Sequence, residues 1–184
     1  MSAILETPGA AASPIPHVPT AIYADGGVIG RNPSPLGGTW AWCQVAGDEF
    51  LCGAAGTILP IDVGAAVVTN NVTEYFALAK ALRYLPDGWS GPVYSDSQIT
   101  LGRFFWGWKN EQIPPRWQQA LRVQLARLGT LDPVLLDGHP TRAQLAAGIG
   151  KRGNPVSRWN CWCDEQCRRQ AEAFMKERTC QKQA

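Results

Sequence analysis

The sequence predicts a mixed α/β domain in which a five-stranded sheet is flanked by helices. The predicted elements follow the order β-β-β-α-β-α-α-β-α, which favours a mixed sheet with helices on its faces. Hydrophobic residues make up 45% of the 184 residues and charged residues 17%, a balance typical of a globular chain with one substantial core. The formal net charge of +2 does not by itself identify a nucleic-acid-binding protein, because local patches matter more than a nearly balanced total.

Composition divides the chain into three expected parts. Residues 1–19 are rich in Ala, Pro and Ser and form a flexible N-terminal tail, residues 20–178 form the folded domain, and residues 179–184 form a C-terminal tail. The first segment has no basic leader, and no stretch reaches the roughly 20 apolar residues of a membrane helix. We therefore expect a cytoplasmic monomer with no membrane partner, whose protein partners the sequence does not identify.

The first three strands are expected close together in the sequence, at residues 20–24, 39–45 and 49–59. The first strand runs into a turn at residues 25–27, where an aspartate precedes two glycines. The second and third strands form a hairpin around an Ala-Gly-Asp turn.

Helices dominate the rest of the chain. The clearest one spans residues 71–85, because its apolar side chains recur at the helical period, and a Pro-Asp-Gly sequence ends it. The later elements are a strand at 92–95, helices at 97–108 and 116–128, a strand at 132–138 and a final helix at 158–178. A long loop rich in Gly, Lys and Arg precedes the final helix.

Four acidic residues stand at the ends of predicted strands or in the first turns of predicted helices: Asp25, Glu74, Asp96 and Asp164. Each has an ordinary explanation. Asp25 suits a turn, Glu74 has capping-box spacing from Asn71, Asp96 has the position of an N-cap, and Asp164 suits a helix dipole. Their joint placement is harder to dismiss, because functional groups of open sheets gather at the carboxyl ends of strands.

Carboxylates gathered at one point have a predictable chemistry. They repel one another and raise each other's pKa values, and a divalent cation relieves that repulsion. Ligands that are all oxygen atoms select magnesium or manganese rather than zinc.

Cysteines offer a second candidate metal site. Cys161, Cys163 and Cys167 cluster near the last helix, but the usual Cys-x-x-Cys spacing of a zinc site is missing. Cys43 and Cys52 lie in predicted strands, where a thiol behaves as a small apolar side chain. We therefore favour reduced, buried cysteines over a zinc centre.

Five short motifs follow one another in a fixed order from about residue 20 to residue 173. They are Ala-Asp-Gly-Gly at 24–27 with Asn32-Pro33, Thr69-Asn70-Asn71 with Glu74, Ser95-Asp96-Ser97-Gln98, Gly138-His139, and Asn160 with Asp164-Glu165. In these motifs and in its order of strands and helices, the chain resembles the type 1 ribonuclease H (ribonuclease HI) family of the ribonuclease H-like superfamily. The resemblance implies the ribonuclease H-like fold.

The resemblance also implies an activity, the hydrolysis of the RNA strand of RNA–DNA hybrids by a two-metal-ion mechanism that leaves 5′-phosphate and 3′-hydroxyl ends. Two Mg²⁺ ions, with Mn²⁺ as a substitute, would be held by Asp25, Glu74, Asp96 and Asp164. His139 would lie on a mobile loop beside them and assist proton transfer or product departure. The residues expected to contact the hybrid are Asn32, Thr69, Asn70, Asn71, Gln98 and Asn160.

The chain departs from the family in a segment that often forms a lysine-rich helical protrusion. Here residues 104–117 contain Lys109 and Arg116 as their only cations, so the basic protrusion is shortened or missing. The segment also holds three tryptophans. We expect at least two of them to be core residues, because large aromatic side chains mostly pack in the interior.

The loop after His139 is the second departure, because it is longer than the family pattern leads us to expect. It carries Lys151 and Arg152 on a glycine-rich backbone. These two cations are candidate phosphate contacts in place of the missing protrusion, and the alternative is a solvated loop.

Other functions stay open at this point. A proofreading exonuclease or an integrase of the same superfamily is one alternative, although such exonucleases usually place Asp-x-Glu on the first strand, where this chain has Asp25 and two glycines. A non-catalytic hybrid-binding module is another, and the loss of a metal-binding carboxylate would favour it. A purely structural domain is a third, because a fold alone does not establish a function.

Overall fold

The computed structural model describes residues 18–181. The N-terminal tail predicted over residues 1–19 falls almost entirely outside the described residues, as do residues 182–184 of the predicted C-terminal tail. The last helix runs to Gln181, past the predicted end of the folded domain at residue 178.

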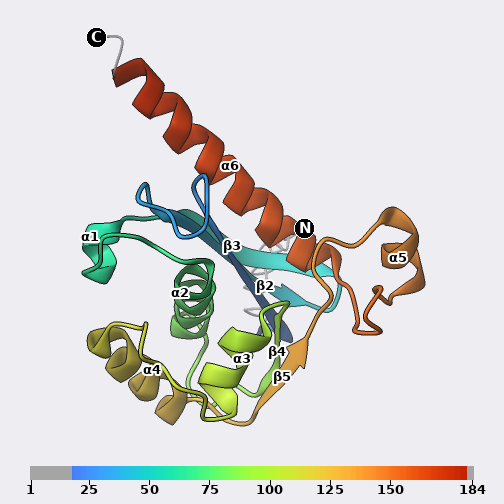
Figure 1. Ribbon diagram of the computed structural model, residues 1–184. Coiled ribbons are helices and arrows are strands. Elements are labelled where there is room, and N and C mark those ends of the chain that lie inside the picture. Colours follow the sequence, from blue (N-terminus) through green and yellow to red (C-terminus); the bar gives the residue numbers. More distant parts are fainter. Residues whose placement is uncertain (1–17, 182–184) are drawn as a thin grey trace, which may run out of the picture.

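Five strands and six helices make up the described part of the chain (Figure 1). The strands are β1 (Ala21–Val28), β2 (Gly38–Ala46), β3 (Glu49–Ile58), β4 (Gly91–Ser95) and β5 (Leu131–Leu135). The helices are α1 (Pro60–Val63), α2 (Asn70–Arg83), α3 (Gln98–Phe105), α4 (Pro115–Arg127), α5 (Arg142–Ala147) and α6 (Arg158–Gln181). The short helices α1 and α5 are additions to the predicted order.

The strands form one mixed sheet in the order β3-β2-β1-β4-β5. β1, β2 and β3 are antiparallel neighbours, whereas β1, β4 and β5 run parallel to one another. The predicted five-stranded mixed sheet is therefore confirmed. The strand order places β1 and β4, which precede two of the acidic motifs, side by side at the centre.

Side chains of β1 alternate between two hydrophobic layers. Ile22 and Ala24 pack in the layer under α2, α3 and α4, and Ala21 and Tyr23 pack in the layer under α6. Figure 1 shows the three helices on one side of the sheet and α6 on the other. This alternation follows from the two-residue repeat of a strand, and it buries both faces of the central strand.

The turn expected after the first strand is wrong. β1 continues through Asp25, Gly26 and Gly27 and stays paired with β2 over these residues. Gly26 is explained by packing instead, because a Cβ atom on this residue would lie 2.4 Å from the backbone nitrogen of Glu74. Glycine is needed here so that α2 can approach the strand closely.

Two expectations about buried side chains are also corrected. Trp106 and Trp108 are 45% and 42% exposed and meet edge to face at 5.8 Å, so only Trp117 of the three tryptophans packs against the core. Cys52 is exposed, because it lies in β3 at the edge of the sheet. Cys43, Cys163 and Cys167 are buried.

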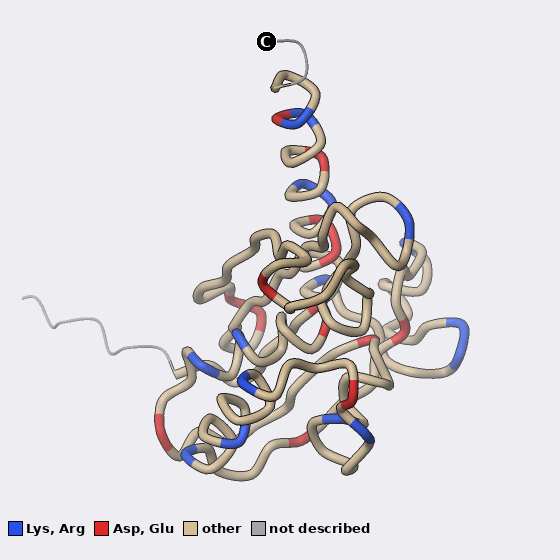
Figure 2. The backbone as a smooth tube through the Cα atoms, turned by 60° about the vertical axis from the view of Figure 1, so that its left-hand side comes forward, with Lys and Arg blue, Asp and Glu red and all other residues tan. Residues whose placement is uncertain are grey.

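The C-terminal helix α6 extends beyond the sheet, and residues of both charge signs alternate along it (Figure 2). Arg168 bonds to both Glu165 and Glu172, at the i,i+3 and i,i+4 spacings that bring helix side chains together. Within residues 18–181, none of the helices combines the length and the apolar character that crossing a membrane would require.

Candidate active site

Strand pairing brings the first two carboxylates together. β1 and β4 are parallel neighbours, and their register aligns Tyr23 with Tyr94. Asp25 and Asp96 each stand two residues further along, so the two side chains emerge at the same end of adjacent strands. Asp25 lies inside β1 and is 7% exposed, whereas Asp96 directly follows β4. The sheet topology therefore creates the first half of the cluster.

Glu74 reaches the same point from α2. Its carboxylate accepts hydrogen bonds from the Asn70 amide at 2.7 Å and from the hydroxyl groups of Ser97 and Thr100 at the start of α3. The sequence reasoning missed these two hydroxyl residues as partners of Glu74. Their spacing, three residues apart in one helical turn, was a signal that both could face one target.

The ordinary capping explanations for the acidic residues are wrong. α2 is preceded by Thr69 and has no capping box, and the N-cap of α3 is Ser97 rather than Asp96. α6 begins at Arg158, so Asp164 lies beyond its first turn. These carboxylates are thus not accounted for by helix ends.

Asp164 brings the fourth carboxylate from α6 and meets His139. The His139 Nδ1 atom lies 3.5 Å from an Asp164 carboxylate oxygen, and the two side chains are 79% and 49% exposed. His139 has a backbone φ of 50°, a left-handed conformation that is uncommon for residues other than glycine. The imidazole therefore sits on an accessible loop, held at the edge of the acidic cluster.

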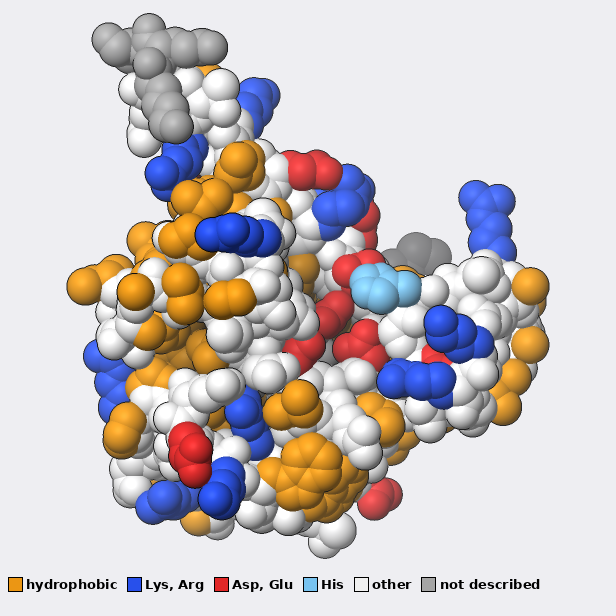
Figure 3. Space-filling model, viewed as in Figure 1, with side chains coloured by type: hydrophobic (Ala, Val, Ile, Leu, Met, Phe, Trp, Pro, Cys, Tyr) orange, Lys and Arg blue, Asp and Glu red, His pale blue; other side chains and the backbone are white. Residues whose placement is uncertain are grey.

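All four carboxylates line one cavity of about 260 Å³. Figure 3 shows acidic side chains gathered in a hollow beside the histidine. The complete lining consists of Asp25, Gly26, Gly27, Asn70, Glu74, Asp96, His139 and Asp164. We call this cavity the carboxylate cavity. The grouping that the sequence predicted is thus present in three dimensions.

Burial and mutual repulsion raise the pKa values of the carboxylates. Burial raises the pKa of Asp25 well above its usual range, and the charges of Asp96 and Glu74 add to the effect. Burial is also the main reason that the pKa of Glu74 rises to about 7 and that the pKa of Asp96 rises. For Asp96, the nearby His139 and the hydrogen-bonding Asn160 act in the opposite direction.

The chemistry of the donors fits a hard divalent cation. The side chains that line the site offer carboxylate oxygens, the Asn70 amide and one imidazole, and oxygen ligands suit Mg²⁺ and Mn²⁺. A cation would also offset the repulsion that raises the carboxylate pKa values. Among residues 18–181, no three acidic, histidine or cysteine side chains are already gathered around a single metal position.

Three of the predicted substrate contacts lie at or beside the cavity in different ways. Asn70 lines the cavity, and its backbone N–H donates to Asn32 Oδ1 at 3.2 Å, so the exposed Asn32 is held at its rim. Asn160 is only 3% exposed and lies beside Asp96. This burial places Asn160 against a carboxylate rather than on the outer surface.

The other predicted contacts lie farther out. Among the described residues, Thr69, Asn71 and Gln98 are not part of the cavity lining, although they flank it at the starts of α2 and α3. Lys151 and Arg152 line a neighbouring cavity. The structure thus gathers the carboxylates more tightly than the residues expected to contact a hybrid.

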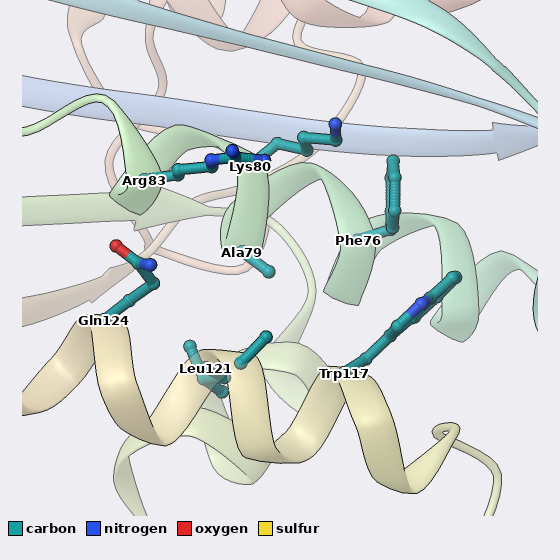
Figure 4. A pocket seen from close by; sticks show the side chains of 8 residues that line it. Phe76, Ala79, Lys80, Arg83, Trp117, Leu121 and Gln124 are labelled. Atoms are coloured by element: carbon teal, nitrogen blue, oxygen red, sulfur yellow. The ribbon is translucent and has the colours of Figure 1, made fainter.

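A separate cavity of about 350 Å³ lies between α2 and α4 (Figure 4). Phe76, Trp117 and Leu121 form its apolar part, and Lys80 and Arg83 stand at its edge. The lining contains no carboxylate, hydroxyl or imidazole group. Although this cavity is larger, its lining has no carboxylate or imidazole to bind a metal ion, and we place the candidate active site at the carboxylate cavity.

Comparison with known proteins identifies a curated relative in sequence. No protein-family model matches the chain. The ribonuclease H of Chlorobium phaeovibrioides (strain DSM 265 / 1930) is 30% identical over 147 residues, which cover 80% of this chain and 91% of the relative.

Solved structures share the fold at lower sequence identity. The N-terminal RNase H domain of Rv2228c from Mycobacterium tuberculosis has a TM-score of 0.57 and 17% identity, over 86% of this chain and 98% of that one. RNase H1 from the halophilic archaeon Halobacterium salinarum NRC-1 has a TM-score of 0.57 and 21% identity, over 83% and 97%. LC11-RNase H1, solved in complex with an RNA/DNA hybrid, has a TM-score of 0.55 and 20% identity, over 84% and 98%.

Proposed function

The chain belongs to the ribonuclease H family, and from that premise we propose that it is an endonuclease that hydrolyses the RNA strand of RNA–DNA hybrids. The observation that carries the proposal is the single cavity lined by all four carboxylates. The structural neighbour solved with an RNA/DNA hybrid supports the choice of substrate. The expected products end in 5′-phosphate and 3′-hydroxyl groups.

The proposed cofactor is a pair of Mg²⁺ ions, with Mn²⁺ as a substitute. Asp25, Glu74, Asp96 and Asp164 are the residues that would hold them. When bound, such ions supply activation of the attacking water and stabilisation of the leaving oxygen. The raised pKa values of Asp25 and Asp96 support this assignment, because burial, together with the charges of neighbouring carboxylates, disfavours their ionised forms unless a cation is bound.

The chain's own residues orient the reacting groups. Ser97, Thr100 and Asn70 hold Glu74 in one position through hydrogen bonds, which limits its rotation while a phosphate group enters. His139 stands beside Asp164 and is largely exposed, so its imidazole can exchange protons with the solvent as a product leaves. These contacts support separate roles for the Glu74 carboxylate, which is held in place, and for His139, which is accessible.

Selection of the RNA strand would come from the 2′-hydroxyl group, which donates and accepts hydrogen bonds and is absent from DNA. Asn32 and Asn70 are joined by a hydrogen bond at the rim of the cavity and are the best-placed amide groups for contacts in the minor groove. Thr69, Asn71 and Gln98 flank them and extend the same surface.

The decisive experiment uses a hybrid labelled separately on each strand, incubated with Mg²⁺ and the native chain. Cleavage confined to the RNA strand, lost in Asp25→Asn and in Asp96→Asn, is the expected result. Matched duplex DNA and duplex RNA serve as controls.

Each alternative function has its own outcome in this experiment. Cutting of duplex DNA would point to another nuclease of the superfamily. A hybrid that binds but stays intact in both Mg²⁺ and Mn²⁺ would point to a non-catalytic binding module. If the chain neither binds nor cleaves the hybrid, the proposal is contradicted outright.

A further inference from the structure

The segment between β5 and α6, residues 136–157, has a hydrogen-bonded backbone, although many of its side chains are exposed. Its backbone is paired internally, since Gly150 donates to the Asn154 carbonyl and Asp137 donates to the Pro155 carbonyl, both at 2.9 Å. α5 opens with a capping box between Thr141 and Gln144. Figure 1 shows this segment beside the start of α6. We call residues 136–157 the wall segment.

Asp137 is the buried centre of the wall segment. It accepts hydrogen bonds from the Arg152 backbone nitrogen at 2.6 Å, from Arg152 Nε at 2.7 Å and from Asn154 Nδ2 at 2.9 Å. Burial alone would raise the pKa of Asp137, but these bonds outweigh it and hold the pKa below its ordinary value. A Cβ atom on Gly150 would lie 2.3 Å from the Asp137 side chain, so the glycine allows this close approach.

Arg152 takes part in the hydrogen bonding of the wall segment. Its guanidinium group bonds to the Asp137 carboxylate and donates to the Leu136 carbonyl at 3.1 Å. The Nε and Nη2 atoms of Arg152 thus have partners within the wall segment, whereas Nη1 has no hydrogen-bond partner among the described residues and the side chain is 54% exposed. Arg152 is therefore partly engaged in the wall segment, and its role as a phosphate contact stays a prediction.

A cavity of about 550 Å³ separates the wall segment from the carboxylates. Asp96 and His139 line both this cavity and the carboxylate cavity, so the two are adjoining parts of one cleft. Thr141, Gln144 and Lys151 line its outer side. Figure 3 shows Lys and Arg side chains on the surface beside the histidine.

The outer side of this second cavity presents hydrogen-bond donors without partners. Within residues 18–181, the exposed Lys151 has no carboxylate within 4.0 Å, in contrast to Arg152. The Gln144 side-chain oxygen accepts from the Thr141 backbone at 2.9 Å, which leaves the amide nitrogen of Gln144 as a donor. An ammonium group and an amide donor next to a phosphodiester site suit an anionic oxygen.

We propose that this second cavity binds a backbone phosphate of the strand being cut, adjacent to the phosphate under hydrolysis, with Lys151 as its charged contact and Gln144 as a donor. The inference rests on the proposed function and adds a substrate subsite to it. The strand assignment follows from continuity, because the cavity shares Asp96 and His139 with the carboxylate cavity. A phosphate contact at this position would take the place of the lysine-rich protrusion, which is shortened or missing in this chain.

The test compares Lys151→Met with Lys176→Met, an exposed lysine near the far end of α6. Hybrid binding is measured without added metal ions across a salt series. Lys151→Met should raise the dissociation constant about fivefold at low salt, the size expected for one exposed ion pair. It should also reduce the salt slope by about 0.9, the value for one phosphate contact. Equal affinities and slopes in the two variants would overturn the inference.

A second measurement identifies the strand. Single neutral methylphosphonates are placed at each position flanking the cleavage site, first in the RNA strand and then in the DNA strand. One replacement in the RNA strand should weaken binding of the parent chain and of Lys176→Met about fivefold, but should leave Lys151→Met unchanged. If only a replacement in the DNA strand weakens binding of the parent chain and leaves Lys151→Met unchanged, the strand assignment is wrong.

Steady-state cleavage separates this inference from the proposed function. Lys151→Met should raise KM about fivefold and leave kcat unchanged, as expected for a contact made equally before and during the reaction. A parent chain that cuts hybrids, with the same KM in both lysine variants, would overturn the subsite and leave the proposed function intact. A parent chain that neither binds nor cuts hybrids would overturn both.

Discussion

Asp25 and Asp137 are both buried aspartates beside the same cleft, 7% and 4% exposed, yet their surroundings differ completely. Asp25 is surrounded by Asp96, Glu74 and Asp164, and burial together with these charges raises its pKa. Asp137 is surrounded by donors from Arg152 and Asn154, which lower its pKa despite burial. Burial alone thus says little about the role of a carboxylate.

The difference between the two sites lies in what each carboxylate lacks. Asp137 has its oxygens satisfied by three hydrogen bonds within the chain, so it stabilises the wall segment. Asp25 accepts one, from the Gly26 backbone at 2.7 Å, and faces like charges. A buried carboxylate such as Asp25, which faces like charges, lowers the stability of the fold unless a cation binds to it. This arrangement is expected at a functional site.

The largest expected effect comes from Asp25→Asn. Cleavage of a hybrid should fall by a factor on the order of 10³, because metal stabilisation of charge is worth several kcal/mol. The same variant should raise the Tm by about 3 °C in metal-free buffer at pH 8, because it removes one of the repelling charges. Activity assays and calorimetry test both parts. A lower Tm would mean that Asp25 stabilises the fold and that the contrast with Asp137 is false.

The pH dependence of stability should follow Glu74, whose pKa is raised from 4.5 to about 7, mainly by burial. The folded chain holds this proton more tightly than the unfolded chain, so the stabilisation is fully present below pH 4.5. It is lost as the pH rises through 7. The contribution is up to about 3 kcal/mol. Urea unfolding without metal ions should show a shallower decline in Glu74→Gln, and an unchanged decline would exclude Glu74 as the cause.

Asp137→Asn should have the opposite effect to Asp25→Asn. Removing the charge weakens the bonds from Arg152, so the Tm should fall by about 5 °C. The value of kcat should change less than tenfold, because Asp137 is not one of the carboxylates proposed to hold a metal ion. Only the loss of such a carboxylate should remove several kcal/mol of transition-state stabilisation. Asp132→Asn, an exposed aspartate of β5, is the matched control and should leave the Tm unchanged. If Asp137→Asn abolished cleavage without lowering the Tm, Asp137 would belong to the reaction.

The smallest expected effect is stabilisation by Mg²⁺. At tenfold excess over the dissociation constant, the ion should contribute about 1.4 kcal/mol and raise the Tm by about 4 °C at pH 8. The increase should vanish in Asp25→Asn and persist in Asp137→Asn. Thermal unfolding with and without the ion provides the measurement, and an increase that survives in Asp25→Asn would place the bound cation elsewhere.

Most of the fold could be predicted from local patterns. The period of apolar side chains identified the helix over residues 71–85 within a few residues of α2, because burying one helical face imposes that spacing directly. The turn expected at residues 25–27 failed, because strand pairing with β2 and the close approach of α2 decide the role of those glycines. Neither contact leaves a local signal.

The candidate site divides in the same way. The order of short motifs identified the four carboxylates, since each motif is a local string of residues. The hydroxyl groups that hold Glu74 and the pairing of the buried Asp137 with Arg152 were not identified. Their partners lie 15 or more residues away in the sequence, and spacing alone cannot show such a pairing.

By itself, then, the sequence determined the longer strands and helices and pointed to four acidic side chains as candidates for one site. These properties depend on periodicity and motif order, which are written along the chain. Only the tertiary structure decided that Asp96 adjoins Asp25, that Asp137 is neutralised by Arg152 and that Lys151 faces a cavity shared with the carboxylates. The energy of a charge depends on what surrounds it in space, and folding alone creates those surroundings.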